Sequence, residues 1–150
     1  MTSLRRPWIV CLAAWLLAAA FLAAAWPKIA DPPGFAEAIH AYGLVPEGYL
    51  APMALVLPWL EALIGLALLS GLARRSAALL ASLLLLVFMG ALAINLWRGH
   101  PVDCGCFGAA TAVRTAAERL TSMKLDLLRD SGLLLLSLLI LRGPKPEVAP

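Results

Sequence analysis

Four long apolar segments constrain the fold of this chain more than any other feature of its sequence. They cover approximately residues 8–26, 50–72, 76–97 and 125–141. The first is about 19 residues long, which makes a helix of roughly 28 Å, enough to cross a bilayer. In the fourth, the purely apolar part begins only at Gly132. The sequence therefore predicts an all-α membrane protein, folded as a bundle of four transmembrane helices.

The overall composition supports a single domain in contact with membrane lipid. Hydrophobic residues make up 62% of the chain, charged residues make up 14%, and the mean hydropathy is +0.87. Soluble domains are only about half apolar. We interpret residues 1–150 as one integral membrane domain with a flexible tail over 143–150. The net charge of +3 is scattered, and without a basic patch interleaved with aromatics we expect no nucleic-acid binding.

The first segment has an alternative interpretation as a secretory signal peptide. Arg5-Arg6 would be its basic start, and Ala23-Ala24-Ala25 would be a cleavage site with small residues. However, the apolar run is long for a signal peptide, and Trp8 and Trp26 bracket it as interfacial aromatics do. A first transmembrane helix is therefore favoured.

The orientation follows from the Lys and Arg residues between the spans. Their totals on the two sides are equal, but the first hairpin usually dominates. Arg5-Arg6 and Arg74-Arg75 on one side outweigh the single Lys28 on the other. We expect a multi-pass protein of a bacterial inner membrane with both termini in the cytoplasm.

Both outer loops are predicted to contain a short interfacial helix. In the first loop, Asp31 can cap a helix that begins at Pro32, and Gly43 can end it. The apolar face of this helix would consist of Phe35, Ile39 and Tyr42. In the second loop, residues 111–124 have amphipathic helical spacing.

The clearest candidate for chemistry is Cys104-Gly105-Cys106 in the second outer loop. A disulfide needs Cα atoms roughly 4.4–6.8 Å apart with a fixed torsion, so two thiols separated by one residue form only a strained ring. Gly105 permits the unusual backbone dihedrals that this ring requires. Strained disulfides exchange more readily than structural ones. We interpret Cys104 and Cys106 as a catalytic redox pair in an oxidising, extracytoplasmic compartment.

Two alternatives for this pair stay open. One is a site for copper(I) or another thiophilic metal, held by Cys104, Cys106 and His100; zinc would require four ligands, and only His100 and Asp103 lie nearby. The other is a structural disulfide, although a link that closes so small a loop removes little chain entropy.

Ionisable residues within the spans are further candidates. Glu61 lies near the middle of the second span, three residues after Pro58, where a charge is costly and commonly functional. Arg129 in the fourth span has two interpretations that stay open: it could reach toward Glu61 as a buried charge partner, or it could extend outward to the membrane surface. The alternative interpretation of Glu61 is a packing residue that bonds to a neighbouring helix. We expect Asp130 to extend outward to the membrane surface.

Two tryptophans within the apolar segments are interpreted structurally. Trp15 and Trp59 lie inside the first and second spans. Both are interpreted as fillers of the core rather than as platforms for a quinone.

With these residues in view, the chain resembles the methylamine utilisation protein E (MauE) family, which is related to the DoxX-like membrane proteins. The resemblance covers nearly the whole chain, and its most specific part is Asp103-Cys104-Gly105-Cys106-Phe107-Gly108. The other matching stretches are Trp26-Pro27-Lys28-Ile29, Leu44-Val45-Pro46, Pro58, Glu61, Gly65, Arg98-Gly99 and Arg129-Asp130.

The resemblance implies an inner-membrane protein that supports redox maturation of secreted proteins. Proteins of this family are associated with producing the disulfide-rich small subunit of methylamine dehydrogenase, alongside a thioredoxin-like extracytoplasmic partner (MauD-like). If the chain is an enzyme, it is a membrane thiol:disulfide oxidoreductase with quinone as the candidate electron carrier. A reducing path from the cytosol would need a second thiol pair inside, and Cys11 alone is not one. The alternatives are a copper(I)-handling protein and a non-catalytic assembly factor.

Overall fold

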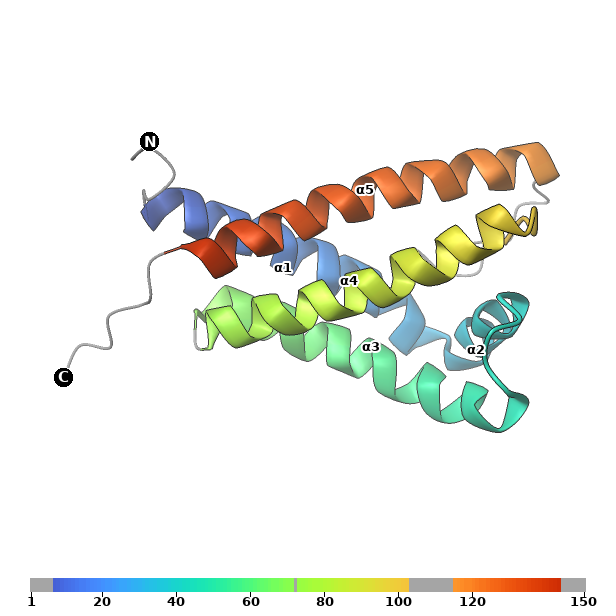
Figure 1. Ribbon diagram of the computed structural model, residues 1–150. Coiled ribbons are helices and arrows are strands. Elements are labelled where there is room, and N and C mark those ends of the chain that lie inside the picture. The colour runs from blue at the N-terminus through green and yellow to red at the C-terminus, as the bar shows by residue number, and fades with distance from the viewer. Residues whose placement is uncertain (1–6, 72, 103–114, 144–150) are drawn as a thin grey trace.

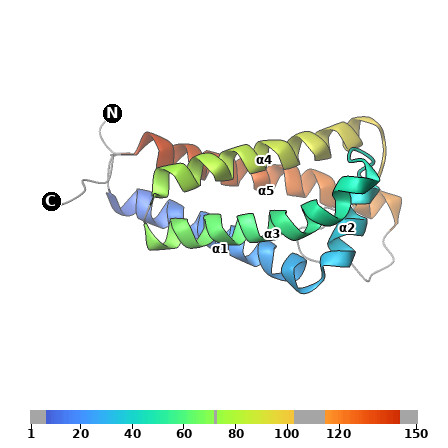
Figure 2. The same cartoon turned by 90° about the horizontal axis from the view of Figure 1, so that it is seen from below.

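The computed structural model describes residues 7–71, 73–102 and 115–143, and the regular structure in these ranges is helical. Within them, five helices follow in chain order: α1 (Pro7–Ala30), α2 (Pro32–Ala41), α3 (Glu47–Ser70), α4 (Arg74–Trp97) and α5 (Ala116–Arg142). The four long helices run lengthwise beside one another in both views, and the short α2 lies at the end where α3 begins and α4 ends (Figures 1 and 2). The all-α prediction is therefore confirmed for the part of the chain described.

Three of these helices are long and apolar enough to cross a membrane, namely Trp8–Ala30, Glu47–Ser70 and Arg74–Trp97. They correspond to the first three predicted spans, with ends shifted by a few residues. The fourth predicted span, 125–141, lies within α5, whose first half carries several charged residues. Within the described ranges, length and apolarity thus support three membrane-crossing helices.

Helix α5 is one continuous helix from Ala116, which corrects the expected division into an interfacial helix over 111–124 and a separate span. Its start is fixed by a capping box, because the Thr115 hydroxyl accepts from the backbone N–H of Glu118 at 3.3 Å and the Glu118 carboxylate accepts from the backbone N–H of Thr115 at 2.7 Å. Residues 111–114 of the predicted stretch lie outside the described residues.

Helix α2 confirms the helix predicted in the first outer loop. Asp31 caps it by accepting from the backbone N–H of Gly34 at 3.0 Å, and Pro32 occupies its first turn. Gly43, with a φ of +62°, follows the C-cap residue Tyr42 and turns the chain toward α3. Phe35 and Ile39 are buried and pack against the first half of α3.

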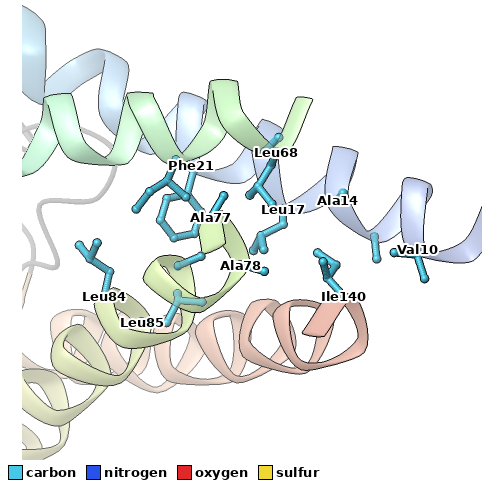
Figure 3. Packing of buried hydrophobic residues seen from close by; sticks show 14 residues of the cluster. Val10, Ala14, Leu17, Phe21, Leu68, Ala77, Ala78, Leu84, Leu85 and Ile140 are labelled. Atoms are coloured by element: carbon cyan, nitrogen blue, oxygen red, sulfur yellow. The ribbon is translucent and has the colours of Figure 1, made fainter. Parts of the chain in front are cut away.

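The main core lies between α1, α3, α4 and α5 and is built mainly from small and aliphatic residues, together with the ring of Phe21 (Figure 3). Helices α1 and α3 approach closely at Gly65, where an added Cβ would lie 2.8 Å from Cγ of Leu22. Helices α4 and α5 are linked inside the bundle by a 2.7 Å hydrogen bond between the hydroxyls of Ser82 and Ser137. Small residues and buried hydroxyls of this kind are typical of helix interfaces in membranes.

The prediction that Trp15 and Trp59 fill the core is wrong. Their exposed fractions are 57% and 59%, so both rings point away from the bundle. The buried face of α1 instead carries Ala14 and Ala18, and this close packing of helices leaves no room for an indole ring.

Candidate functional site

The most distinctive polar feature of the described residues is an ion pair buried between α1 and α3. The Lys28 ammonium donates to both carboxylate oxygens of Glu61, at 2.7 Å and 2.8 Å. Each residue is only 3% exposed. The buried partner of Glu61 is therefore Lys28, whereas the sequence had suggested Arg129 as one of two open possibilities.

The two helices place these side chains opposite each other for identifiable reasons. Lys28 lies in the last turn of α1, where a cation interacts favourably with the carbonyl end of the helix. Glu61 lies inside α3, and Pro58 and Gly65 share its buried face at helical spacing. The close approach of the backbones at Gly65, one turn beyond Glu61, lets the lysine reach the carboxylate without leaving the helix interface.

Two aromatic rings enclose the ammonium group. The Nζ atom of Lys28 lies 5.0 Å from the ring centroid of Phe35 in α2 and 5.3 Å from that of Phe88 in α4. Cations within about 6 Å of an aromatic face are attracted to the electrons of the ring. Four helices thus contribute to the surroundings of one positive charge.

Helix α5 brings a second pair of charges to the same place. Arg129 and Asp130 line a cavity of about 60 Å³ together with Lys28 and Glu61. Arg129 donates to Asp130 at 2.9 Å and also lies 3.1 Å from Asp126. The cavity therefore brings together two basic and two acidic side chains, and it is large enough to admit water.

The expectation that Asp130 extends outward to the membrane surface is wrong. Asp130 is 3% exposed and faces the cavity. Its carboxylate remains inside because Arg129 on the same helix supplies a charged hydrogen-bond donor.

Sequence reasoning missed Lys28 because it assigned this residue to the loop after a first span that ended at Trp26. The structure continues α1 through Pro27 to Ala30, so Lys28 belongs to the helix. A signal was present in the sequence, since Trp26-Pro27-Lys28-Ile29 and Glu61 both belong to the stretches that carry the family resemblance.

Cys104 and Cys106 lie outside the described residues, as do Asp103 and the tail after Gly143. The described residues on either side show where this segment begins and ends. Before the segment, Val102 is buried against Leu92 of α4 and Met123 of α5. After the segment, Thr115 caps α5. The end of α4 and the start of α5, which flank this segment, lie at the end of the bundle where α2 lies (Figure 2).

The third cysteine lies at the other end of the bundle. Arg74, at the turn between α3 and α4, donates to Cys11 Sγ at 3.4 Å, and this turn lies at the far end from α2 (Figure 1). Cys11 is thus far from both Val102 and Thr115, as expected from its place in the first segment.

The described ranges contain no group of three or more His, Cys, Asp or Glu side chains that could hold a metal ion. His100, the described member of the alternative metal site, is exposed after the end of α4. The copper(I) alternative therefore depends on the two cysteines that lie outside the described residues.

Comparison with known proteins gives one consistent result. Residues 6–143 match the family described as methylamine utilisation protein MauE. The chain is 36% identical over 108 residues to the methylamine utilization protein MauE of Methylophilus methylotrophus, and 40% identical over 92 residues to that of Paracoccus denitrificans. It is 37% identical over 108 residues to that of Methylorubrum extorquens.

These alignments cover 61–71% of this chain. They cover 50–58% of the relatives, so the chain spans little more than half the length of the curated proteins that it matches. No solved structure matches the chain.

Proposed function

The chain belongs to the methylamine utilisation protein MauE family, and from this premise we propose that it is an inner-membrane thiol/disulfide redox protein. Its role would be to support disulfide formation in secreted proteins. The observation that carries the proposal is the Cys104-Gly105-Cys106 sequence in the segment between α4 and α5. Strain in so small a disulfide ring favours exchange over a purely structural role.

In the proposed topology, α5 is the fourth membrane-crossing helix. Its 27 residues make a helix about 40 Å long. Arg129 pairs with Asp126 and Asp130, and Arg129 and Asp130 line the interior cavity, whereas Lys124 nearer the start of the helix is exposed. Both termini would then be cytoplasmic, and the end with α2 and the cysteine segment would be extracytoplasmic.

The proposed reaction has two balanced halves. A thiolate of a reduced partner attacks the Cys104–Cys106 disulfide, forming a mixed disulfide and releasing one cysteine of this protein. The second partner thiol then resolves the mixed disulfide, so that the partner leaves oxidised and Cys104 and Cys106 are left as a dithiol. A membrane quinone takes the two electrons and two protons that regenerate the disulfide.

The partner best suited to this chemistry is a thioredoxin-like extracytoplasmic protein, whose paired thiols exchange through mixed disulfides. Membership of the family links the chain to methylamine utilisation. We extend this link to the client and infer that the oxidising equivalents serve the disulfide-rich small subunit of methylamine dehydrogenase.

The experiment that tests the proposal traps the partner. In a strain that carries Cys106→Ala, the Cys104 thiolate can attack the disulfide of the oxidised partner, which is the reverse of the proposed exchange, and Cys106 is not there to displace the partner from the mixed disulfide. Non-reducing electrophoresis and mass spectrometry should identify a secreted or periplasmic protein with paired cysteines, bound in near-stoichiometric amount.

The matched control is Cys11→Ala, which removes a thiol at the other end of the bundle and should trap nothing. If neither Cys104→Ala nor Cys106→Ala captures a thiol protein, and the double Cys→Ser variant retains full activity in secreted-protein maturation, the redox role is wrong and an assembly factor is indicated.

A further inference from the structure

A second, larger cavity lies between α2, α3 and α4. Its volume is about 360 Å³, within the range of sites that bind small organic molecules. Its walls include Phe35 and Ile39 from α2, Leu57 from α3, and Phe88 and Ile94 from α4. Of the described residues that line it, Tyr42 alone has a polar side-chain group, so the cavity suits an apolar ligand.

The apolar cavity and the charged cavity share a wall. Phe88 lines both of them. Phe35 and Phe88 also hold the Lys28 ammonium at 5.0 Å and 5.3 Å from their ring centroids. One layer of aromatic rings therefore separates an apolar chamber from the Lys28–Glu61 pair.

The apolar cavity also lies toward the end of the bundle that carries the cysteine segment. Ile94 is one turn before the end of α4 at Trp97, and Tyr42 packs with the buried cluster that includes Val102. Tyr42 thus connects the cavity to the cluster that contains Val102, the last described residue before the cysteine segment.

We propose that this cavity binds the ring of a membrane quinone, which is the electron acceptor of the Cys104/Cys106 dithiol; this inference rests on the proposed function. A flat, uncharged ring suits a chamber with aromatic walls, because aromatic rings stack favourably on phenyl groups. In the step that follows, the two thiols lose two electrons and two protons and form one S–S bond. The quinone gains both electrons, and each of its oxygens gains one proton, which gives a quinol.

The alternative occupant, a lipid acyl chain, would leave the adjacent charges unexplained. A buried ion pair is costly to place beside an apolar chamber, and an acyl chain neither accepts nor releases protons. A quinone does exchange protons when it is reduced, so a cluster of paired charges behind the aromatic wall has a use there.

The test fills the cavity without disturbing the helix. Gly90 lines the cavity, and an added Cβ there meets no heavy atom within 4 Å. Gly90→Leu should therefore insert and fold, and leucine is also the better helix former. Gly132 in α5 is the matched control, since its added Cβ also meets nothing within 4 Å and it does not line the cavity.

The measurement is photolabelling of the full chain in lipid nanodiscs with a short-chain azido-quinone, competed by the unmodified quinone. It is made with both cysteines of the pair changed to serine, so that binding is observed without turnover. We expect labels on peptides of α2, α3 and α4. The apparent affinity should be at least tenfold weaker in Gly90→Leu and unchanged in Gly132→Leu.

Each other outcome has a definite meaning. Equal labelling of the two leucine variants, labels confined to outward-facing residues, or a bound phospholipid that quinone does not displace would overturn the site. If the quinone binds as expected but the cysteine pair of the native chain never exchanges with a thiol protein, the proposed function fails and the quinone site stands.

Discussion

Lys28 connects the parts of the buried charged site. It is the partner of Glu61, it contacts the rings of Phe35 and Phe88, and it lines the cavity with Arg129. Removing one member of a buried ion pair leaves the other charge without compensation and costs about 3–5 kcal/mol, whereas replacing both by apolar residues is often neutral. This asymmetry separates a structural role of the pair from a functional one.

The first prediction concerns stability. Lys28→Met and Glu61→Leu should each destabilise the fold by about 3–5 kcal/mol, because each leaves an unpaired buried charge. The double variant should recover most of this loss. Thermal unfolding in detergent, followed by near-ultraviolet circular dichroism, measures the three variants against the native chain. Additive losses in the double variant would contradict the pairing of Lys28 with Glu61.

The second prediction concerns function. If the pair serves proton exchange during quinone reduction, the double variant Lys28→Met/Glu61→Leu, although stably folded, should oxidise its dithiol at least tenfold more slowly than the native chain. The rate is measured by alkylation and mass spectrometry after quinone is added to proteoliposomes. Ser82→Ala, a buried polar change elsewhere in the bundle, is the control. A double variant as fast as the native chain would make the pair a packing device.

At this scale, the sequence singled out Glu61 as an ionisable residue within a span, but it did not identify Lys28 as its partner. Glu61 stands out because it interrupts a long apolar run, and its position within the helix can be counted directly. The partner depends on how far α1 continues past Trp26 and on how α1 sits against α3. The second depends on tertiary packing, such as the close approach of α1 to Gly65, which local sequence patterns do not encode.

At the scale of the elements, α5 differs most from expectation. Its purely apolar part begins only at Gly132, and the charged residues Lys124, Asp126 and Arg129 interrupt the apolar pattern before it. The pattern therefore does not show that the helix already begins at Ala116. The capping box at Thr115 and Glu118 was readable and marks the true start. The ends of α2 were predictable because Asp31, Pro32 and Gly43 are strong local signals. Local chemistry thus fixes helix ends, while burial of charges in α5 depends on its neighbours.

The third prediction is that α5 crosses the membrane. Thr121 and Arg142 are exposed and lie near opposite ends of the helix, about 32 Å apart at 1.5 Å per residue. In a chain without native cysteines, Thr121→Cys should react with a membrane-impermeant maleimide added to spheroplasts, and Arg142→Cys should react only after lysis.

Controls for this experiment exist on the neighbouring helices. Tyr49→Cys at the start of α3 should behave like Thr121→Cys, and Ser76→Cys at the start of α4 should behave like Arg142→Cys. If the two α5 positions react from the same side, α5 lies along the surface and the bundle has three crossing helices.

At the scale of the whole molecule, the two ends of the bundle have different chemistry. One end brings together α2, the apolar cavity and the described flanks of the cysteine segment. The other holds the two arginines of the α3–α4 turn, where Arg75 donates to the carbonyl of Leu141 at the end of α5. Arginine at this turn favours a cytoplasmic location for that end.

The fourth prediction is therefore one of orientation. In a Cys11→Ser chain the sequence leaves Cys104 and Cys106 as the remaining thiols. After mild reduction of intact spheroplasts, an impermeant thiol reagent should label them without lysis. The variant Cys104→Ser/Cys106→Ser, which retains Cys11, should be labelled only after lysis. If instead Cys11 is labelled in intact spheroplasts and the Cys104/Cys106 pair only after lysis, the topology is inverted and the pair lies in the reducing cytoplasm.

The most direct test of the account is the reduction potential of the cysteine pair. The Cys11→Ser chain is equilibrated in glutathione and dithiothreitol buffers of known potential, and the oxidised fraction is measured by alkylation and mass spectrometry. A strained, exchangeable disulfide should have a midpoint above about −300 mV, the level below which stable secreted disulfides lie. A bond as resistant to reduction as those disulfides, or a pair that never forms an intramolecular disulfide, would contradict a redox role for Cys104 and Cys106.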